Sequence, residues 1–202
     1  MSKAKIAVLV SGGGTNLQAL IDAQNSGIIN SGNIEIVISS NANAYALVRA
    51  QNAGIDTAVV SKKECGSQEE FERRIVALLN ENSIDIIVLA GFMSILSADF
   101  TSRYPRKIIN VHPSLIPAFC GKGFYGLRVH EAALHYGVKV SGATVHFVNE
   151  IPDGGEIIMQ KAVAIRENDT AESLQKHIMR LAEWKILPKS VEKVCAQLIN
   201  ER

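Results

Sequence analysis

The chain has 202 residues, nearly half of them apolar, and a formal net charge of +1. This length can enclose one substantial hydrophobic core, and the small net charge argues against a general nucleic-acid-binding protein. No run approaches the ~20 consecutive apolar residues of a membrane-spanning helix, and the N-terminus lacks the layout of a secretory signal. Three cysteines at no metal-ligand spacing indicate reduced thiols. We therefore expect a cytoplasmic protein that binds no nucleic acid, no membrane and no metal.

Short apolar segments rich in β-branched residues recur along the first half of the chain, with helical patterns between them. They lie at residues 6–10, 34–38, 57–60, 84–89 and 108–111. Nearly continuous apolar strands separated by amphipathic helices are typical of a parallel sheet covered on both faces. Right-handed crossovers then give a doubly wound α/β fold, in which ligands lie beyond the carboxyl ends of the strands.

Two further strand-like segments, at residues 143–148 and 157–165, are joined by a turn and predict an antiparallel extension of the mostly parallel sheet. From residue 170 to about residue 196 the pattern is helical. Pro188 lies inside this segment and is expected to interrupt the C-terminal helix, because proline has no N–H to donate.

The first strand ends in a glycine-rich turn that contains Gly14, Thr15 and Asn16, and a helix is expected to begin near Asn16. Glycines permit positive φ and close backbone approach, and the free amides at a helix start suit a phosphate. The turn lacks the Gly-Lys pair of a Walker A loop, and Leu17 stands where a dinucleotide-binding pattern has its third glycine. We expect a phosphate site without a nucleotide cofactor, and the alternative is a plain tight turn.

An amide and an imidazole follow the fifth predicted strand. Asn110 and His112 are two residues apart, so in an extended chain their side chains point the same way. Pro113 and Pro117 stiffen the loop that follows. An amide donor beside a titratable imidazole suits a reaction that develops negative charge on oxygen, although a lone histidine in such a loop is more often structural.

The turn between the two last strands carries Asp153 in front of two glycines. Taken alone, an aspartate in a turn rich in proline and glycine is a turn former. Its carboxylate also offers a charge that could hold a neighbouring imidazole in its protonated form.

These segments resemble the family of folate-dependent phosphoribosylglycinamide formyltransferases, and they occur in the family's order. The matching segments are residues 11–18, 89–96 and 110–117, the turn at 153–155, and Glu183 in a late helix before Pro188. The resemblance covers essentially the whole chain. It implies one domain with a Rossmann-like formyltransferase fold, in which residues 1–105 form a phosphate-binding half and residues 106–202 a catalytic and folate-binding half.

The resemblance implies transfer of the formyl group of 10-formyltetrahydrofolate, the co-substrate, to the amine of glycinamide ribonucleotide in purine biosynthesis. The amine attacks the formyl carbon directly, so neither a covalent enzyme intermediate nor a metal is expected. Asn110 and protonated His112 would stabilise the oxyanion, and Asp153 would favour the imidazolium. The expected partners are these small molecules, and the chain is expected to be a monomer or a homodimer.

The resemblance also implies the residues that bind the two substrates. The ribonucleotide would contact Gly14, Thr15 and Asn16 through its phosphate, and Arg180, Leu181, Ala182 and Glu183 through its ribose or amine. The folate site would be walled by Met93, Ser94, Ile95, Leu96, Asn149, Glu150, Ile151 and Pro152.

One position departs from the family. Where many relatives carry an arginine that contacts the glutamate tail of the folate, this chain has Gln68, which leaves Lys62 or Lys63 as candidates to replace that contact. His146 and Cys120 lie close to family segments without an assigned role. The other three histidines, His130, His135 and His177, are expected to be structural or exposed.

Three alternatives remain. A formyltetrahydrofolate hydrolase would need an N-terminal regulatory domain, for which 202 residues leave no room, and usually has His-His-Ser where this chain has His112-Pro113-Ser114. A methionyl-tRNA formyltransferase would need a C-terminal tRNA-binding domain. A non-catalytic folate- or nucleotide-binding module would have no need for Asn110, His112 and Asp153 together.

Overall fold

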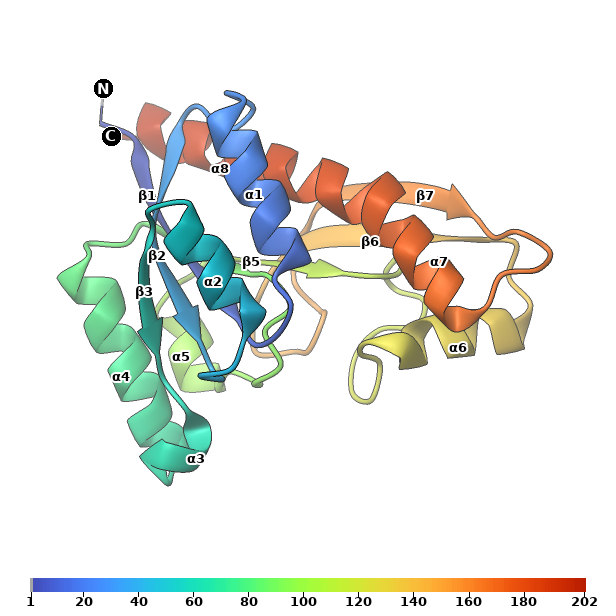
Figure 1. Ribbon diagram of the computed structural model, residues 1–202, viewed down its shortest axis with the longest axis horizontal. Helices are drawn as coiled ribbons and strands as arrows, with labels where there is room; N and C mark the ends of the chain where they lie inside the picture. Colours follow the sequence, from blue (N-terminus) through green and yellow to red (C-terminus); the bar gives the residue numbers. More distant parts are fainter. Residues whose placement is uncertain (1) are drawn as a thin grey trace.

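Seven strands form one sheet in the computed structural model, which describes residues 2–202 (Figure 1). They are β1 (Ala4–Val10), β2 (Gly32–Ser39), β3 (Asp56–Val59), β4 (Ile86–Leu89), β5 (Ile108–His112), β6 (Val140–Phe147) and β7 (Ile157–Ala164). The order is β3-β2-β1-β4-β5-β6-β7. Strands β1 to β5 pair in parallel, and β6 and β7 extend the sheet by antiparallel pairing. The predicted doubly wound fold with an antiparallel extension is confirmed.

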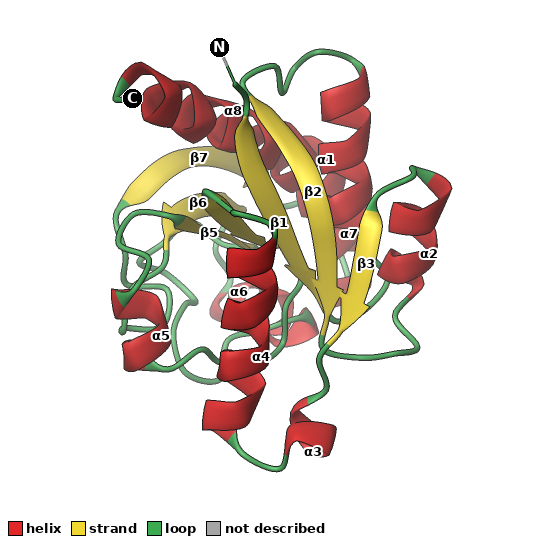
Figure 2. Cartoon of the chain, turned by 90° about the vertical axis from the view of Figure 1, so that its left-hand side faces the viewer, coloured by secondary structure: helices red, strands yellow, loops and turns green. Residues whose placement is uncertain are grey.

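Helices cover both faces of the sheet (Figure 2). They are α1 (Thr15–Asn25), α2 (Tyr45–Asn52), α3 (Lys62–Cys65), α4 (Gln68–Glu81), α5 (Ala98–Ser102), α6 (Leu127–Tyr136), α7 (Ala171–Ile178) and α8 (Trp184–Asn200). One core lies between the sheet and α1, α2, α7 and α8, and a second core lies between the sheet and α4 and α5. Within residues 2–202, none of these helices combines the length and the apolar character that a bilayer-spanning helix needs.

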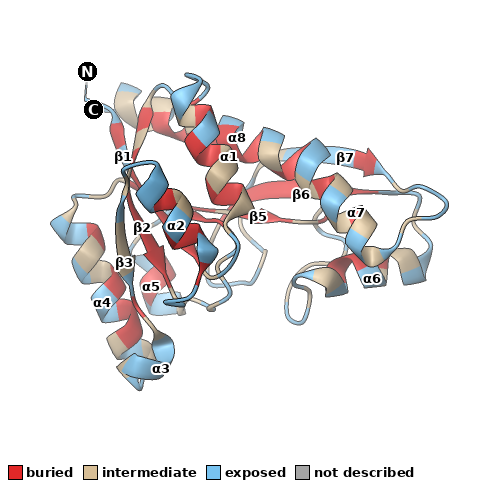
Figure 3. Cartoon of the chain, in the orientation of Figure 1, coloured by how far each residue is buried: buried red, intermediate tan, exposed pale blue. Residues whose placement is uncertain are grey.

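The apolar runs of the strands follow from this two-sided burial. In β1, Ile6, Val8 and Val10 pack into the first core, while Ala7 and Leu9 pack into the second. Because successive side chains of a strand point to opposite faces, a strand covered on both faces needs apolar residues at every position. Figure 3 shows the resulting burial of the central strands.

The strand order places three loops at one end of the sheet. The chain runs outward from β1 to β2 and β3, then returns to β4 on the other side of β1, so the order reverses beside β1. The loops that follow β1, β4 and β5 leave the carboxyl ends of neighbouring parallel strands. Such a reversal is where open α/β sheets bind ligands.

The expected break of the C-terminal helix at Pro188 is wrong. Pro188 lies inside α8, and the irregular turn is a π-helical segment, η1 (Met179–Glu183), between α7 and α8. A proline removes the N–H that would reach the carbonyl four residues earlier and its ring crowds that carbonyl. The wider π turn ends directly before Trp184, whose carbonyl would receive that missing bond.

Candidate active site

A cavity of about 150 Å³ lies at the carboxyl ends of β4 and β5 and brings together residues of two loops, which follow β4 and β6, with side chains of the strands. Its lining includes Asn110 and Asp153 and six of the predicted folate-site residues: Ser94, Ile95, Leu96, Asn149, Glu150 and Pro152. Met93 and Ile151, which were predicted with them, do not line the cavity and are largely exposed.

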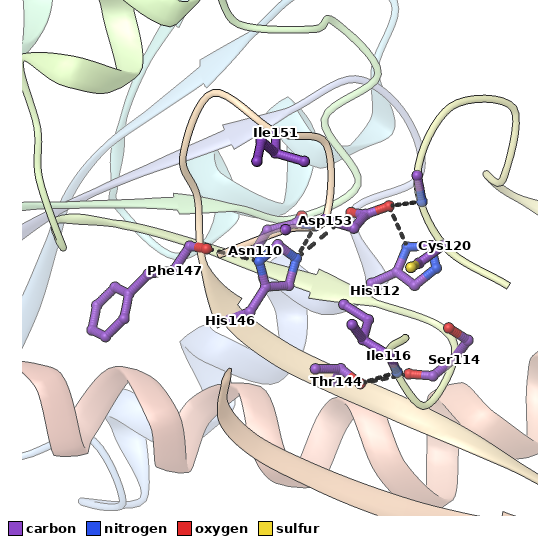
Figure 4. Close-up of polar contacts among 12 residues, drawn as sticks. Asn110, His112, Ser114, Ile116, Cys120, Thr144, His146, Phe147, Ile151 and Asp153 are labelled. Atoms are coloured by element: carbon purple, nitrogen blue, oxygen red, sulfur yellow. Dashed lines mark hydrogen bonds and ion pairs between the residues drawn. The ribbon is translucent and has the colours of Figure 1, made fainter. Parts of the chain in front are cut away.

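His112 is buried at the end of β5, and both its ring nitrogens face oxygen acceptors, of which Figure 4 shows the carboxylate of Asp153. Nδ1 lies 3.5 Å from a carboxylate oxygen of Asp153, and Nε2 lies 2.8 Å from the carbonyl oxygen of Phe119. The same Asp153 oxygen accepts a hydrogen bond of 2.8 Å from the amide of Gly121. The predicted pairing of His112 with Asp153 is therefore present in the fold.

The protonation state of His112 differs from the expectation. Burial lowers the pKa of His112, and the opposing effects of the Asp153 charge and the Phe119 carbonyl do not restore it to the ordinary value. Asp153 acts on His112 in the predicted direction, but the expectation of a raised pKa was wrong, because desolvation outweighs the single carboxylate. Burial also acts to raise the pKa of Asp153, but hydrogen bonding from His146, the charge of His112 and the Gly121 amide together lower it.

His146 is the residue that the sequence left without a role. Its Nδ1 lies 2.8 Å from the carbonyl of Phe147, which can only accept, so Nδ1 carries a proton. In the neutral ring Nε2 then accepts from the side-chain amide of Asn110, 3.2 Å away. Nε2 also lies 3.6 Å from Asp153, to which the protonated ring would donate. His146 thus contacts two of the three predicted catalytic residues.

Strand pairing explains this arrangement. In the antiparallel register of β5 and β6, Asn110 lies opposite His146 and His112 lies opposite Thr144. The hydroxyl of Thr144 donates to the carbonyl of Ser114 over 2.7 Å and accepts from the amide of Ile116 over 3.1 Å. Strand β6 therefore contacts the Asn110 side chain through His146 and holds the loop that follows β5 through Thr144.

The remaining histidines and Cys120 do not add a nucleophile or a further base to this site. His130 is fully buried on α6, and burial lowers its pKa to about 4. His135 is exposed, and His177 is paired with Asp169 beside α7. Burial, with a contribution from the Asp153 charge, raises the pKa of the Cys120 thiol and keeps it protonated.

The glycine turn forms the second part of the site. Helix α1 begins at Thr15, and Gly14 has φ 71°, a left-handed conformation that favours glycine. The side-chain amide of Asn16 donates to a carboxylate oxygen of Glu183 over 2.7 Å, and both side chains are buried. Burial raises the pKa of Glu183 to about 7. The oxygen of the Asn16 amide accepts no hydrogen bond from the described residues.

The neighbours of Glu183 in η1 do not all reach this site. Ala182 is completely buried in the first core, so its side chain faces away from any ligand. Arg180 and Leu181 are exposed. Of the four predicted residues in this segment, the structure brings only Glu183 into contact with the glycine turn.

Known proteins with similar sequences and structures share this arrangement of strands and loops. A model of the formyl transferase family matches residues 4–191. The phosphoribosylglycinamide formyltransferase of Haemophilus influenzae is 45% identical over 91% of this chain and 84% of its own length. A solved structure of the corresponding protein from Coxiella burnetii is 38% identical, has a TM-score of 0.88, and covers 97% of this chain and 89% of its own. This chain belongs to the formyl transferase family.

The chain thus has the family membership that its sequence indicated. It matches the human trifunctional purine biosynthetic protein adenosine-3 with 45% identity over 98% of this chain, which spans only 19% of that longer protein. A family of formyltransferases implies a folate-derived one-carbon donor. The cavity at the ends of β4 and β5 is the candidate binding site for this donor.

Gln68, the position that departs from many relatives, is turned toward one wall of this cavity. Its side-chain nitrogen donates to a carboxylate oxygen of Glu72 over 2.5 Å and to the carbonyl of Ile95 over 3.1 Å. Glu72, which is buried, also accepts from the amide and the hydroxyl of Ser97, each at 2.6 Å. Gln68 therefore braces the segment around Ile95, and Lys62 and Lys63 remain exposed on α3.

One hydroxyl joins the two loops of the site. The amide of Met93 donates to the hydroxyl oxygen of Ser11 over 2.9 Å, and Ser11 also forms a hydrogen bond of 2.6 Å with the hydroxyl of Ser40. The glycine turn and the segment after β4 are thereby held at a fixed separation.

Proposed function

We propose that this formyltransferase transfers the formyl group of 10-formyltetrahydrofolate to the amine of glycinamide ribonucleotide. The observation that carries the proposal is the convergence of Asn110, His112 and Asp153 at the end of β5. This group stands beside a cavity of suitable size for part of a flat heterocycle. The similarity to phosphoribosylglycinamide formyltransferases supports the choice of acceptor.

In the proposed reaction the acceptor amine attacks the formyl carbon, and the bond from that carbon to the folate nitrogen breaks. A proton leaves the amine and a proton is delivered to the folate nitrogen. Negative charge builds on the formyl oxygen between these steps, and the side-chain amide of Asn110 donates to it. His112, whose pKa is lowered by burial, takes up the proton that the attacking amine releases, because the developing negative charge beside it raises its pKa, and His112 then delivers this proton to the folate nitrogen.

Asp153 and His146 support this exchange. The carboxylate of Asp153 lies within 3.6 Å of both imidazole rings, and its charge stabilises the positive charge that forms on His112. Donation from Asn110 to His146 Nε2 orients the Asn110 amide, whose second N–H is left for the formyl oxygen.

The two substrates are proposed to lie on either side of this group. The phosphate of the ribonucleotide meets Gly14, Thr15 and Asn16, and Glu183 accepts from its ribose or amine, with Arg180 at the edge. The folate lies against the cavity residues of the two walls, with Met93 and Ile151 covering its outer face. In this arrangement residues 1–105 form the phosphate-binding half, which also supplies the folate wall at residues 93–96, and residues 106–202 form the catalytic and folate-binding half of a single domain.

A formyl-transfer assay with three competing acceptors tests the function. Glycinamide ribonucleotide, water and methionyl-tRNA are offered together with 10-formyltetrahydrofolate, and each formylated product is quantified. We expect product from glycinamide ribonucleotide, and a loss of that product in Asn110→Ala. Release of formate without an acceptor would instead indicate a hydrolase, and formylated methionyl-tRNA would overturn the proposed acceptor.

A further inference from the structure

Arg49, on α2, contacts the glycine turn and lies outside the group of residues that the family resemblance assigns to either substrate. Its Nε donates to the carbonyl oxygen of Gly13 over 2.9 Å, and its Nη1 donates to the side-chain oxygen of Gln18 over 3.0 Å. We propose that Arg49 is a positioning residue for the phosphate of the acceptor. Arg49 orients the backbone amides of the glycine turn and gives the turn a positive charge. This inference rests on the proposed binding of the acceptor phosphate at the turn.

Peptide geometry shows how Arg49 aims an amide. In a trans peptide the C=O and the following N–H point in opposite directions. Arg49 holds the carbonyl of Gly13 toward α2, so the N–H of Gly14 points away from α2. One residue earlier, the amide of Ala46 donates to the carbonyl of Gly12 over 3.1 Å, so the N–H of Gly13 also points away from α2.

These two amides form an anion-binding arrangement. No described residue accepts a hydrogen bond from the N–H of Gly13 or Gly14. The left-handed Gly14 brings them together with the free amides of the first turn of α1. The turn also packs tightly on α2, because a Cβ on Gly14 would stand 2.6 Å from that of Ala46. Helix α2 is therefore a template that sets the direction of both amides.

Arg49 also brings a full positive charge into contact with the turn. Residues 11–16 contain no lysine or arginine, and a phosphate dianion gains more from a charged donor than from neutral amides alone. Among the described residues, no carboxylate forms an ion pair with Arg49, whose guanidinium lies over the ring of Tyr45 at 5.0 Å. Arg49 and Thr15 both line a cavity of about 490 Å³, which Lys185 and Lys189 also line and the glycines of the turn do not.

The test compares Arg49→Gln and Arg49→Lys with the parent, and Arg74→Gln on α4 is the matched control. We expect Arg49→Gln to raise KM for glycinamide ribonucleotide about 10- to 100-fold, the usual effect of losing a charged hydrogen-bond donor. KM for the formyl folate should stay within about twofold. Arg49→Lys keeps the charge but not the planar fork that reaches both acceptors, so its effect should be intermediate.

Two further measurements separate positioning from general damage. With the dephosphorylated ribonucleoside as acceptor, Arg49→Gln should be no worse than the parent, since the missing contact serves only the phosphate. Calorimetric titration with inorganic phosphate, which needs no formyl transfer, should show weaker binding to Arg49→Gln than to the parent and to Arg74→Gln. Equal phosphate affinity in all three proteins would overturn the role of Arg49 even if the proposed reaction is found.

A parallel rise of both Michaelis constants, or an equal loss with the ribonucleoside, would likewise overturn it and assign Arg49 to the stability of the turn. If the parent protein transferred the formyl group of the folate to a different acceptor, the titration with inorganic phosphate would still decide the role of Arg49.

Discussion

The amide of Asn16 and the carboxylate of Glu183 meet at 2.7 Å, although 167 positions separate them in the chain. This contact joins the start of α1 to the π turn before α8 and places a buried acid beside the glycine turn. Because Asn16 is its one hydrogen-bond donor among the described residues, the carboxylate is poorly compensated when charged.

This burial predicts a pH dependence of stability. The pKa of Glu183 is raised by burial to about 7, so the folded state holds a proton that the unfolded state releases near pH 4.5. The stability linked to this proton is complete below about pH 4.5 and is lost as the pH rises through about 7. Glu183→Gln abolishes the titration and keeps the volume, so its stability relative to the parent should improve by up to about 3 kcal/mol between pH 5 and pH 8. Urea unfolding at both pH values measures this; a constant difference would contradict it.

Gly14→Ala should disrupt the glycine turn. The new Cβ would stand 2.6 Å from that of Ala46, at a residue with φ +71°. A left-handed non-glycine residue costs about 1–3 kcal/mol, and the crowding adds to this. We expect lower stability and a higher KM for the ribonucleotide. Gly12→Ala is the control, because a Cβ added at Gly12 would meet nothing within 4 Å. Equal losses of stability and equal rises of KM in the two variants would show that crowding against Ala46 is not the cause.

Asp153→Asn tests the electrostatic support of His112. The pKa of His112 is already lowered by burial, with Asp153 opposing that shift, so removing the charge should lower the pKa further. Loss of a proton-transfer role typically reduces the rate ~10²–10⁴-fold, so kcat should fall while both substrates still bind. Because His112 must be neutral to take up the proton of the amine, the rise of activity with pH should occur at lower pH in the variant than in the parent.

An NMR titration of His112 measures the pKa directly in the parent and in Asp153→Asn. The exposed Asp99→Asn change serves as the control, since Asp99 pairs only with Arg103 on α5. If Asp153→Asn were fully active, Asp153 would be a turn residue and the proposed mechanism would lose its electrostatic support.

Glu72→Gln should loosen one wall of the folate cavity. Glu72 accepts hydrogen bonds from Gln68 and twice from Ser97. In Glu72→Gln the new NH2 group would face one of these donors, and neither could accept a hydrogen bond from the other. A buried donor left without an acceptor costs about 1–3 kcal/mol. We expect reduced stability and a KM that rises more for the formyl folate than for the ribonucleotide. Glu69→Gln, at an exposed position of the same helix, is the control; equal changes in both Michaelis constants would indicate a general loss of structure.

Gln68 predicts a weak preference for long folate tails. Its side chain is occupied by Glu72 and Ile95, and an exposed ion pair at this place would add only ~0.2–1 kcal/mol in any case. Affinity for folates with one and with five glutamates should therefore be similar in the parent. Strong discrimination by tail length in the parent would mean that another cation, such as Lys62 or Lys63, makes the contact.

Local patterns in the sequence were sufficient to predict the sheet and the pair at the end of β5. Continuous apolar strands identify two-sided burial, and the two-residue spacing of Asn110 and His112 places them on one face. The partnership of His146 with Asn110 depends on the register of β5 against β6, which the turn length and the apolar pattern did not determine in advance. That register would have identified His146 as a site residue.

Other features depend on distances that no local pattern contains. The contact of Asn16 with Glu183 needs the packing of α1 against α8 and η1. The lowered pKa of His112 reflects the depth of burial, whereas the neighbouring carboxylate alone suggested the opposite direction. Pro188 was expected to break a helix, but the fold widened the preceding turn and kept the helix intact.

The hydroxyl of Ser11, shared between the glycine turn and the backbone of Met93, has a consequence for how the two substrates influence each other. A ligand that displaces either loop must strain or break this hydrogen bond, whose net contribution is about 1 kcal/mol. Cooperativity transmitted through it is therefore limited to roughly a fivefold change in affinity. Such coupling is reciprocal, so the donor and the acceptor would strengthen each other's binding by the same modest factor, whichever arrives first.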